Sequence, residues 1–272
     1  MNLNPHNPGT ILVIGSTGKT GKRVFQGLKE RKLSVRSGSR SATPAFDWEN
    51  QGTWAAALEG IDSVYLSYYP DLAVPEAPAA IKQFCRVARQ QNIKHLVLLS
   101  GRGEPAAQHC EEIVKESGIP WTIIRASWFN QNFSEGAFYD MVQDGVMALP
   151  IGNVGEPFVD VDDIADVAIA AFTEPGHTGQ LYEVTGPRLL TFDDVAKELS
   201  AGLNKPVQFI QISTEVFEQE MLKQGVPVDT ISMLLFLFNE VLDGRNAYVT
   251  QGVEQALGRK PRDFSAFVSN LK

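Results

Sequence analysis

Ile11-Leu12-Val13-Ile14-Gly15-Ser16-Thr17-Gly18-Lys19-Thr20-Gly21 is the stretch that decides the fold, because it joins an apolar strand to a helix through three glycines. The first glycine permits a tight turn, the second lets backbone approach a phosphate, and the third lets the helix pack closely on the strand. Amides at the helix N-terminus, aided by the helix dipole, then face the anion. The stretch therefore predicts a cradle for a pyrophosphate, with Lys19 either near the phosphates or facing water.

The residues around this stretch support a strand-helix-strand unit. Val24 and Leu28 are four apart, so the segment after Gly21 has an apolar helical face, and residues 33–38 follow as a second strand. The P-loop of kinases and ATPases needs a glycine five residues before Gly18, where this chain has Val13. The pattern thus excludes a P-loop and favours a dinucleotide.

Composition excludes several classes of protein. The chain has 272 residues, 43% of them hydrophobic and 21% charged, which is typical of a globular protein. Its formal net charge of −8 predicts no nucleic-acid partner. Cys85 and Cys110 form no CxxC pair and the four histidines have no metal-ligand spacing, so no metal site is expected.

No segment of the sequence predicts a secretory signal or a membrane anchor. The first ten residues lack a basic region followed by an apolar one. The longest apolar run, residues 231–238, is far shorter than the roughly 20 residues that span a bilayer. We expect a cytoplasmic protein without membrane contacts.

Strand-like and helix-like segments alternate through about residue 130, which indicates an α/β, Rossmann-type doubly wound parallel sheet. The expected strands are 11–14, 33–38, 45–48, 63–68, 95–100 and 121–125, and the expected helices are 19–31, 52–59, 76–91 and 105–117. We expect an NADP-binding domain over residues 1–150 and a small C-terminal α+β substrate lobe over residues 151–272. Strands or helices of residues 151–272 can also rejoin the sheet of the NADP-binding domain. Within residues 151–272, Thr191-Phe192-Asp193-Asp194 predicts a capping box.

The end of the second strand distinguishes the two nicotinamide dinucleotides. A carboxylate there binds the ribose hydroxyls of NAD, whereas an arginine accommodates the 2′-phosphate of NADP. This chain has Ser39-Arg40-Ser41 and no acidic residue at that point. The guanidinium and the flanking hydroxyls predict NADP(H) as the cofactor.

The chain resembles the NmrA-like, atypical branch of the short-chain dehydrogenase/reductase superfamily, and within it the festuclavine/agroclavine dehydrogenase group and its bacterial relatives. The resemblance covers nearly the whole chain. Beyond the glycine stretch and Ser39-Arg40-Ser41, it is carried by five segments: Phe46-Asp47-Trp48, Val97-Leu98-Leu99-Ser100, Trp128-Phe129-Asn130-Gln131-Asn132-Phe133, Pro157 to Ala165, and Gly258-Arg259-Lys260-Pro261-Arg262.

The resemblance implies roles for particular residues. The glycine stretch from Gly15 to Gly21 holds the pyrophosphate, Arg40 holds the 2′-phosphate, and Asp47 with Trp48 lies near the adenine. The segment from Ser67 through Tyr68 and Tyr69 to Pro70 lines the ribose and nicotinamide crevice, together with Ser100 and Gly101. The candidates for the wall of a substrate pocket are Trp128, Phe129, Asn132 and Phe133, either as pocket or as core.

The chain departs from the superfamily's catalytic pattern. Ordinary members use a Tyr-x-x-x-Lys pair on the helix after the fifth strand, in which the lysine lowers the pKa of the tyrosine. Here the corresponding helix has His109 followed four residues later by Ile113, and no tyrosine lies between Tyr69 and Tyr139. The catalytic residues are therefore unknown, with Ser100 and His109 as weak candidates.

Two functions fit this departure. The first is an NADPH-dependent oxidoreductase that transfers hydride to an activated acceptor, such as a cyclic iminium, an enone or a quinone. A small hydrophobic or aromatic substrate would then lie under residues 209–243, whose apolar positions fit a pocket roof, a homodimer contact or plain core. The alternative is a non-catalytic NADP(H)-binding redox sensor of NmrA type with a protein partner. A nucleotide-sugar epimerase is disfavoured because it also needs the missing tyrosine and lysine.

Overall fold

The computed structural model describes residues 8–271 and divides the chain into two compact units. The first contains the described residues up to Ala126, then Val161–Val184 and Gln251–Arg259. The second contains Ser127–Asp160, Thr185–Thr250 and the described residues from Lys260. A single boundary at residue 150 does not describe this division, because the chain leaves the sheet at residue 126 and later returns to it.

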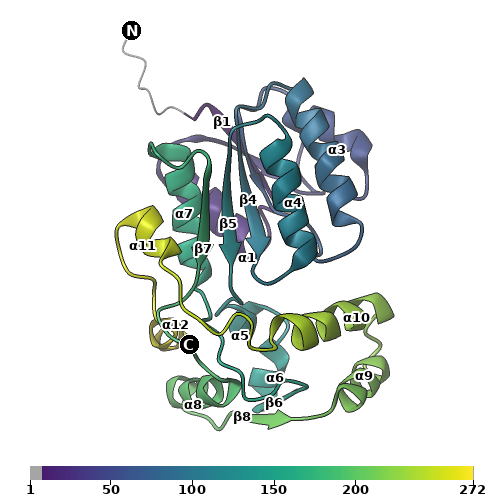
Figure 1. Ribbon diagram of the computed structural model, residues 1–272, viewed down its shortest axis with the longest axis vertical. Helices are drawn as coiled ribbons and strands as arrows, with labels where there is room; N and C mark the ends of the chain where they lie inside the picture. The colour runs from purple at the N-terminus through teal and green to yellow at the C-terminus, as the bar shows by residue number, and fades with distance from the viewer. Residues whose placement is uncertain (1–7, 272) are drawn as a thin grey trace. The chain divides into compact units, whose positions relative to one another are not determined.

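The first unit is a parallel sheet of six strands in the order β2-β1-β3-β4-β5-β7, with helices on both faces (Figure 1). This order confirms the expected Rossmann-type fold. The elements of the unit are β1 (Thr10–Ile14), α1 (Lys19–Glu30), β2 (Ser34–Gly38), η1 (Gln51–Thr53), α2 (Trp54–Leu58), β3 (Ser63–Leu66), α3 (Ala77–Gln90), β4 (His95–Gly101), α4 (Pro105–Glu116), β5 (Trp121–Ala126), α7 (Val161–Thr173), β7 (Gln180–Val184) and α11 (Gly252–Leu257).

The inner strands β1, β3, β4 and β5 are mostly buried, as expected for a parallel sheet with helices on both faces, whereas the edge strands β2 and β7 are more exposed. Alternate side chains, such as Leu12 and Ile14 of β1, join one core with α2, α3 and α4. Helices α1 and α7 pack together on the other side, where a Cβ atom added to Gly27 would lie 2.5 Å from Cδ1 of Ile169. A bulkier residue at position 27 would therefore separate these two helices.

The strand predicted at residues 45–48 is wrong. This segment is irregular, and Phe46 and Trp48 pack with Trp54 and Phe84 in an aromatic cluster, with Phe46 and Trp48 edge to face at 5.1 Å between ring centroids. The backbone N–H of Phe46 donates to the carbonyl of Ser39 at 2.9 Å rather than to a strand. Alternating aromatic residues in a loop thus produced the strand-like pattern.

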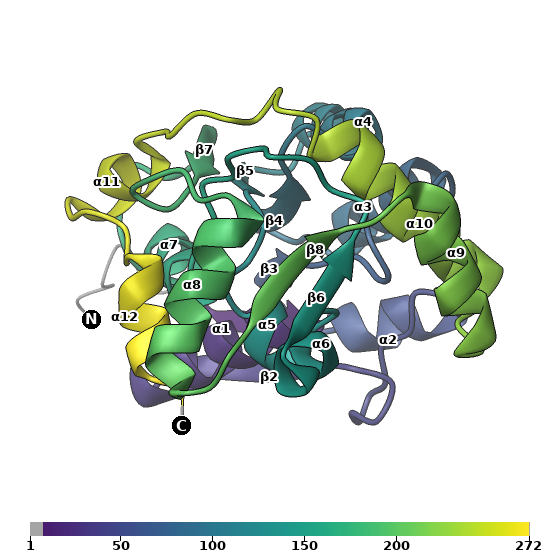
Figure 2. The same cartoon turned by 90° about the horizontal axis from the view of Figure 1, so that it is seen from below.

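The second unit contains a two-stranded parallel sheet, β6-β8, with helix α8 beside α12 (Figure 2). Its core is aromatic: Phe133, Phe138, Phe158, Phe192 and Phe264 are all at most 2% exposed. The elements are α5 (Asn132–Glu135), α6 (Tyr139–Asp144), β6 (Val146–Leu149), α8 (Phe192–Leu203), β8 (Gln208–Gln211), α9 (Thr214–Lys223), α10 (Val228–Phe236), the short π-helix η2 (Leu237–Val241) and α12 (Phe264–Ser269).

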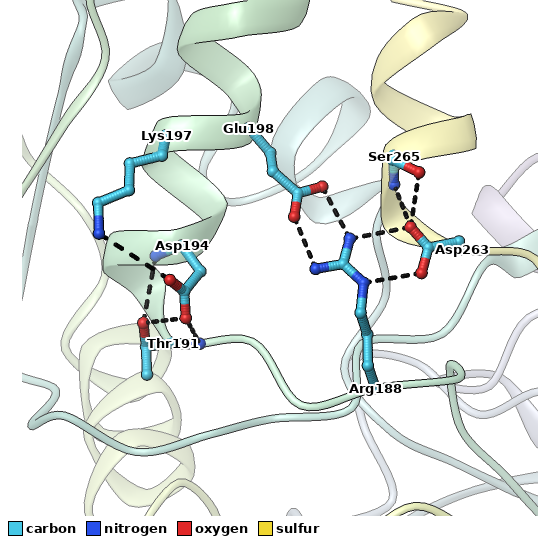
Figure 3. A network of polar contacts seen from close by, with 7 residues as sticks. All are labelled: Arg188, Thr191, Asp194, Lys197, Glu198, Asp263 and Ser265. Atoms are coloured by element: carbon cyan, nitrogen blue, oxygen red, sulfur yellow. Dashed lines mark hydrogen bonds and ion pairs between the residues drawn. The ribbon is translucent and has the colours of Figure 1, made fainter.

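Arg188 joins two helices of the second unit (Figure 3). Its guanidinium forms a two-bond pair with Glu198 of α8 and another with Asp263, the residue that caps α12. Hydrogen bonds from Arg188 hold the pKa of Asp263 well below its ordinary value. Thr191 and Asp194 form the predicted capping box at the start of α8, so that prediction is confirmed.

Candidate functional site

The glycine turn after β1 has the geometry that its sequence predicts. Gly15 has a φ of +72°, which favours glycine, and its N–H donates to the carbonyl of Gly38 at 2.9 Å. The N–H of Gly18 turns back to the carbonyl of Gly15 at 2.8 Å. A Cβ atom added to Gly21 would lie 2.2 Å from that same carbonyl oxygen, so the helix packs on the turn only with glycine there.

Helix α1 starts without a side-chain cap at its N-cap position. Gly18 is its N-cap, no side chain forms a cap hydrogen bond, and the first turn has no acidic residue. The first N–H groups of a helix have no partner within the helix, and the helix dipole gives them partial positive charge. With Ser16 next to the turn, its hydroxyl 2.7 Å from that of Ser37, this end of α1 is suited to an anion.

The loop after β2 presents a cation and two hydroxyl groups. The hydroxyls of Ser39 and Ser41 lie 3.3 Å apart, and the N–H groups of Ala42 and Phe46 both donate to the carbonyl of Ser39. Arg40 is exposed, and within residues 8–271 its guanidinium makes no hydrogen bond or ion pair. This loop can therefore receive a second phosphate group.

The structure brings Trp48 to the carboxyl end of β3. Its indole N–H donates to the carbonyl of Ser67 at 3.0 Å, and its ring lies 4.8 Å from that of Tyr68. A Cβ atom added to Gly15 would lie 3.4 Å from the hydroxyl of Ser67, so Ser67 also borders the glycine turn. The indole N–H of Trp54 donates a hydrogen bond to the backbone carbonyl of Asp47, with 2.7 Å between nitrogen and oxygen.

Tyr69 is 65% exposed, whereas Tyr68 is half-buried. Burial, together with the nearby charge of Glu76, raises the pKa of Tyr68. Tyr68 is therefore neutral near pH 7 and offers a ring face rather than charge at this edge.

The two weak catalytic candidates occupy different environments. Ser100, at the end of β4, is 4% exposed and donates its hydroxyl to Oε1 of Glu111 at 2.6 Å. His109 is exposed on α4. On the same helix, Lys115 pairs with Glu112 at 2.7 Å. The arrangement therefore places Ser100, but not His109, within a buried polar network.

That buried network includes charged residues that the sequence reasoning missed. Glu111 is fully buried and also accepts Nε of Arg125 at 2.9 Å, while a second nitrogen of Arg125 pairs with its other oxygen. Arg102, only 3% exposed, pairs with Glu183 at 2.6 Å. The network ties α4 to the ends of β4, β5 and β7. The sequence signal for this network was Arg125, a charged residue within the otherwise apolar strand 121–126.

Asp71 and Glu104 form a second missed group, in the loops after β3 and β4. Their side chains are hydrogen-bonded to each other, and Asp71 also accepts the N–H of Ala73 at 2.8 Å. Glu104 is 8% exposed, and its Oε2 has no hydrogen-bond partner among residues 8–271. Burial raises the pKa of both carboxyl groups, and the charge of Asp71 raises that of Glu104 further, well above its ordinary value.

The expected pocket residues lie in the second unit. Phe133 is 1% exposed in the aromatic core, where it packs against Phe158 and Phe264. Trp128 is half-buried and stacks on Phe138 at 5.9 Å. Phe129 and Asn132 are half-buried, and Phe129 forms an isolated bridge with Val159. Of the four, Phe133 is clearly part of the core.

The described part of the chain offers neither a membrane-spanning helix nor a cluster of metal-binding side chains. None of its helices is long and apolar enough to cross a membrane. Between residues 8 and 271 there is also no cluster of three or more His, Cys, Asp or Glu side chains that could hold a metal ion.

Comparison with known proteins identifies relatives along the whole chain. Residues 107–268 match the NmrA-like family, and residues 15–175 match an NAD(P)H-binding family. An NAD(P)H azoreductase of Xenophilus azovorans is 31% identical over 94% of this chain and 96% of its own. An agroclavine dehydrogenase of Claviceps fusiformis is 30% identical over 97% of both chains.

A solved structure has the same fold. The NADPH-dependent quinone oxidoreductase of Escherichia coli, complexed with NADPH, superposes with a TM-score of 0.80 at 19% identity. The match covers 95% of this chain and 98% of that one.

Proposed function

Because this chain belongs to the NmrA-like family and carries an NAD(P)H-binding domain, we propose that it is an NADPH-dependent reductase acting on an activated acceptor. The acceptor is a cyclic iminium, an enone or a quinone. The observation that carries the proposal is the uncapped N-terminus of α1 beside the exposed cation of Arg40.

The residues of the first unit fit the dinucleotide. Gly15, Gly18 and Gly21 bring backbone close to the pyrophosphate, and the first amides of α1 donate to it. Trp48 and Asp47 would hold the adenine, and Ser67, which accepts the indole N–H of Trp48, borders the glycine turn. Ser100 and Gly101, at the carboxyl end of β4, line the crevice where such sheets bind their ligands.

Arg40 gives the preference for NADPH over NADH. A guanidinium binds a phosphate through charge-assisted hydrogen bonds, and the hydroxyls of Ser39 and Ser41 add further donors. The end of β2 has no carboxylate that would repel the 2′-phosphate.

The acceptor class follows from the groups that α4 offers. When bound, the reduced nicotinamide supplies a hydride ion, which carries two electrons to the acceptor. Helix α4 has no tyrosine to protonate a simple carbonyl, and its Lys115 is paired with Glu112. An acceptor that is already electrophilic suits these residues. The relatives whose names include an azo compound, agroclavine and a quinone support this class.

The first test measures the role of Arg40. Arg40→Glu should raise the Kd for NADPH about 10- to 100-fold, since a hydrogen bond to a charged group contributes about 1.5–3 kcal/mol, and should change the Kd for NADH much less. Arg86→Glu is the matched control, because Arg86 is an arginine of α3 with an exposed contact to Gln83. Equal losses for both dinucleotides in Arg40→Glu would show that this residue does not recognise the 2′-phosphate.

The second part of the test measures turnover. NADPH oxidation is followed with a panel of cyclic iminium compounds, enones and quinones. Steady oxidation with one of these classes supports the proposal. No turnover across the panel, together with strong discrimination between NADP⁺ and NADPH in binding, would instead favour the redox sensor.

A further inference from the structure

Two loops at the carboxyl end of the sheet place a pair of carboxyl groups beside Gly101. Glu104 is the residue before helix α4, and Asp71 lies in the loop after β3, 33 residues earlier in the chain. A Cβ atom added to Gly101 would lie 2.2 Å from both carboxyl oxygens of Glu104. The absence of a side chain at position 101 is therefore what makes room for this carboxyl group at the strand end.

Two hydrogen-bonded carboxyl groups need a proton between them, because two carboxylates are both acceptors. Glu104 is the member that holds it. Glu104 is the more buried of the two, and the negative charges of Asp71 and of Glu111 on α4 both oppose its ionisation. Glu111 itself remains charged, pairs with Arg125 and accepts the hydroxyl of Ser100, so it does not share the proton of Glu104. Asp71 accepts a backbone N–H, which suits its charged form.

We propose that Glu104 is the proton donor of the reductase, held ready by Asp71. This inference rests on the proposed function and adds to it the group that completes the reduction of acceptors whose product is an anion. Oε2 of Glu104 is buried and makes no hydrogen bond with any residue between 8 and 271, and it belongs to a carboxyl group that packs against Gly101 at the carboxyl end of β4, the end at which such sheets bind their ligands.

The proton balance is simple. Hydride addition to an enone places two electrons on the acceptor and leaves an enolate. The O–H bond of Glu104 breaks, the proton forms a new bond on the enolate, and Glu104 remains as a carboxylate. That carboxylate regains a proton from solvent on the side of Asp71, which is half-buried. Hydride addition to an iminium gives a neutral amine, and no proton is required.

This difference between acceptors makes a sharp test. Glu104→Gln keeps the size of the side chain and a hydrogen-bond donor for Asp71 but has no proton to release. We expect kcat with an enone to fall about 100-fold or more, the typical contribution of a general acid. The kcat with a cyclic iminium and the Kd for NADPH should stay within about twofold of the unmodified protein, because neither depends on proton donation. Glu112→Gln is the matched control, since Glu112 is an exposed carboxylate on the same helix.

Asp71→Asn sharpens the test through the pH profile. Removal of the Asp71 charge lowers the pKa of Glu104, so the loss of enone reduction at alkaline pH should begin at lower pH in Asp71→Asn. An unchanged pH profile would contradict the role of Asp71.

A second readout does not depend on turnover. The infrared difference spectrum of the unmodified protein minus Glu104→Gln at pH 7 should contain the C=O stretch of a protonated carboxyl group. Absence of that band would overturn the proposal, as would equal loss of enone and iminium reduction in Glu104→Gln, which indicates a structural role. If the unmodified protein reduces an enone and Glu104→Gln reduces it equally well, the role of Glu104 as proton donor is wrong, while the proposed reductase function stands. If the unmodified protein reduces no acceptor, the proposed function itself fails.

Discussion

Helices α1 and α8 both have 12 residues but begin in opposite ways. Helix α8 starts with a reciprocal capping box, in which Thr191 and Asp194 satisfy each other's backbone N–H groups. Helix α1 starts at Gly18, where no side chain forms a cap. A cap contributes about 1 kcal/mol to stability, so α1 lacks a stabilising contact that α8 has. The cap stabilises α8, whereas the uncapped start of α1 is what the proposed pyrophosphate site requires.

The largest effect is expected when α1 is given the kind of cap that α8 has. Gly18→Asp places a carboxylate at the N-cap, where a φ of −82° allows an L residue and the added Cβ would lie 3.3 Å from the carbonyl oxygen of Gly15, a tight contact that a small backbone shift relieves. That carboxylate occupies the amides and repels a pyrophosphate, so the Kd for NADPH should rise about 100-fold, or about 2.7 kcal/mol. Isothermal titration calorimetry measures this change.

The free energy of unfolding of Gly18→Asp should change by less than about 0.5 kcal/mol, because aspartate is at least as good an N-cap as glycine. Unchanged NADPH binding in a folded Gly18→Asp protein would contradict the proposed difference between the two helix starts, since the amides of α1 would then have no part in binding.

An intermediate effect is expected from Arg188 in the second unit. Arg188→Met keeps much of the alkyl stem but removes both two-bond ion pairs. The side chains of Arg188 and Asp263 are 39% and 32% exposed, so we expect a loss of only about 1–2 kcal/mol of unfolding free energy. NADPH binding should not change. Chemical denaturation gives the stability, and calorimetry gives the binding.

The pH dependence of this variant has a defined sign. Arg188 lowers the pKa of Asp263 in the folded state, so the stabilisation is present above the ordinary pKa of an aspartate and is lost as the pH falls below it. The stability difference between the unmodified protein and Arg188→Met should therefore be constant near neutral pH and shrink below about pH 4. A difference that grows in acid would contradict the assigned ion pairs.

The smallest effect is expected from the loss of the α8 cap. Thr191→Ala removes the hydroxyl that accepts the N–H of Asp194 at 3.1 Å, which should cost about 1 kcal/mol of stability. Thermal unfolding measures the loss, and Kd for NADPH should be unchanged. A reduced affinity for NADPH in Thr191→Ala would show that the two helix starts are not independent.

Local sequence patterns predicted the parts of the molecule that depend on neighbouring residues. The glycine stretch, the capping box and the alternation of strands and helices are all short-range signals, and the structure has all three. Phe46 and Trp48 misled the prediction because inward-facing aromatic residues in a loop have the same spacing as in a strand.

The polar groups at the carboxyl end of the sheet could not be predicted in the same way. Asp71 and Glu104 are far apart in the chain, and only the parallel pairing of β3 with β4 brings their loops together. Glu111 and Arg125 meet only because α4 lies against β5. No spacing in the sequence encodes these pairs.

The discontinuity of the first unit has a consequence for biosynthesis. Strand β5 pairs with β7, whose last residue, Val184, leaves the ribosome 58 residues after Ala126. Helix α11 comes later still, and its Gly252 leaves no room for a Cβ against the carbonyl of Glu183. Until these segments are synthesised, β5 has an open edge of unpaired backbone groups, which is a template for aggregation. A nascent chain halted near residue 150 would therefore expose this edge, even though its glycine turn is already complete.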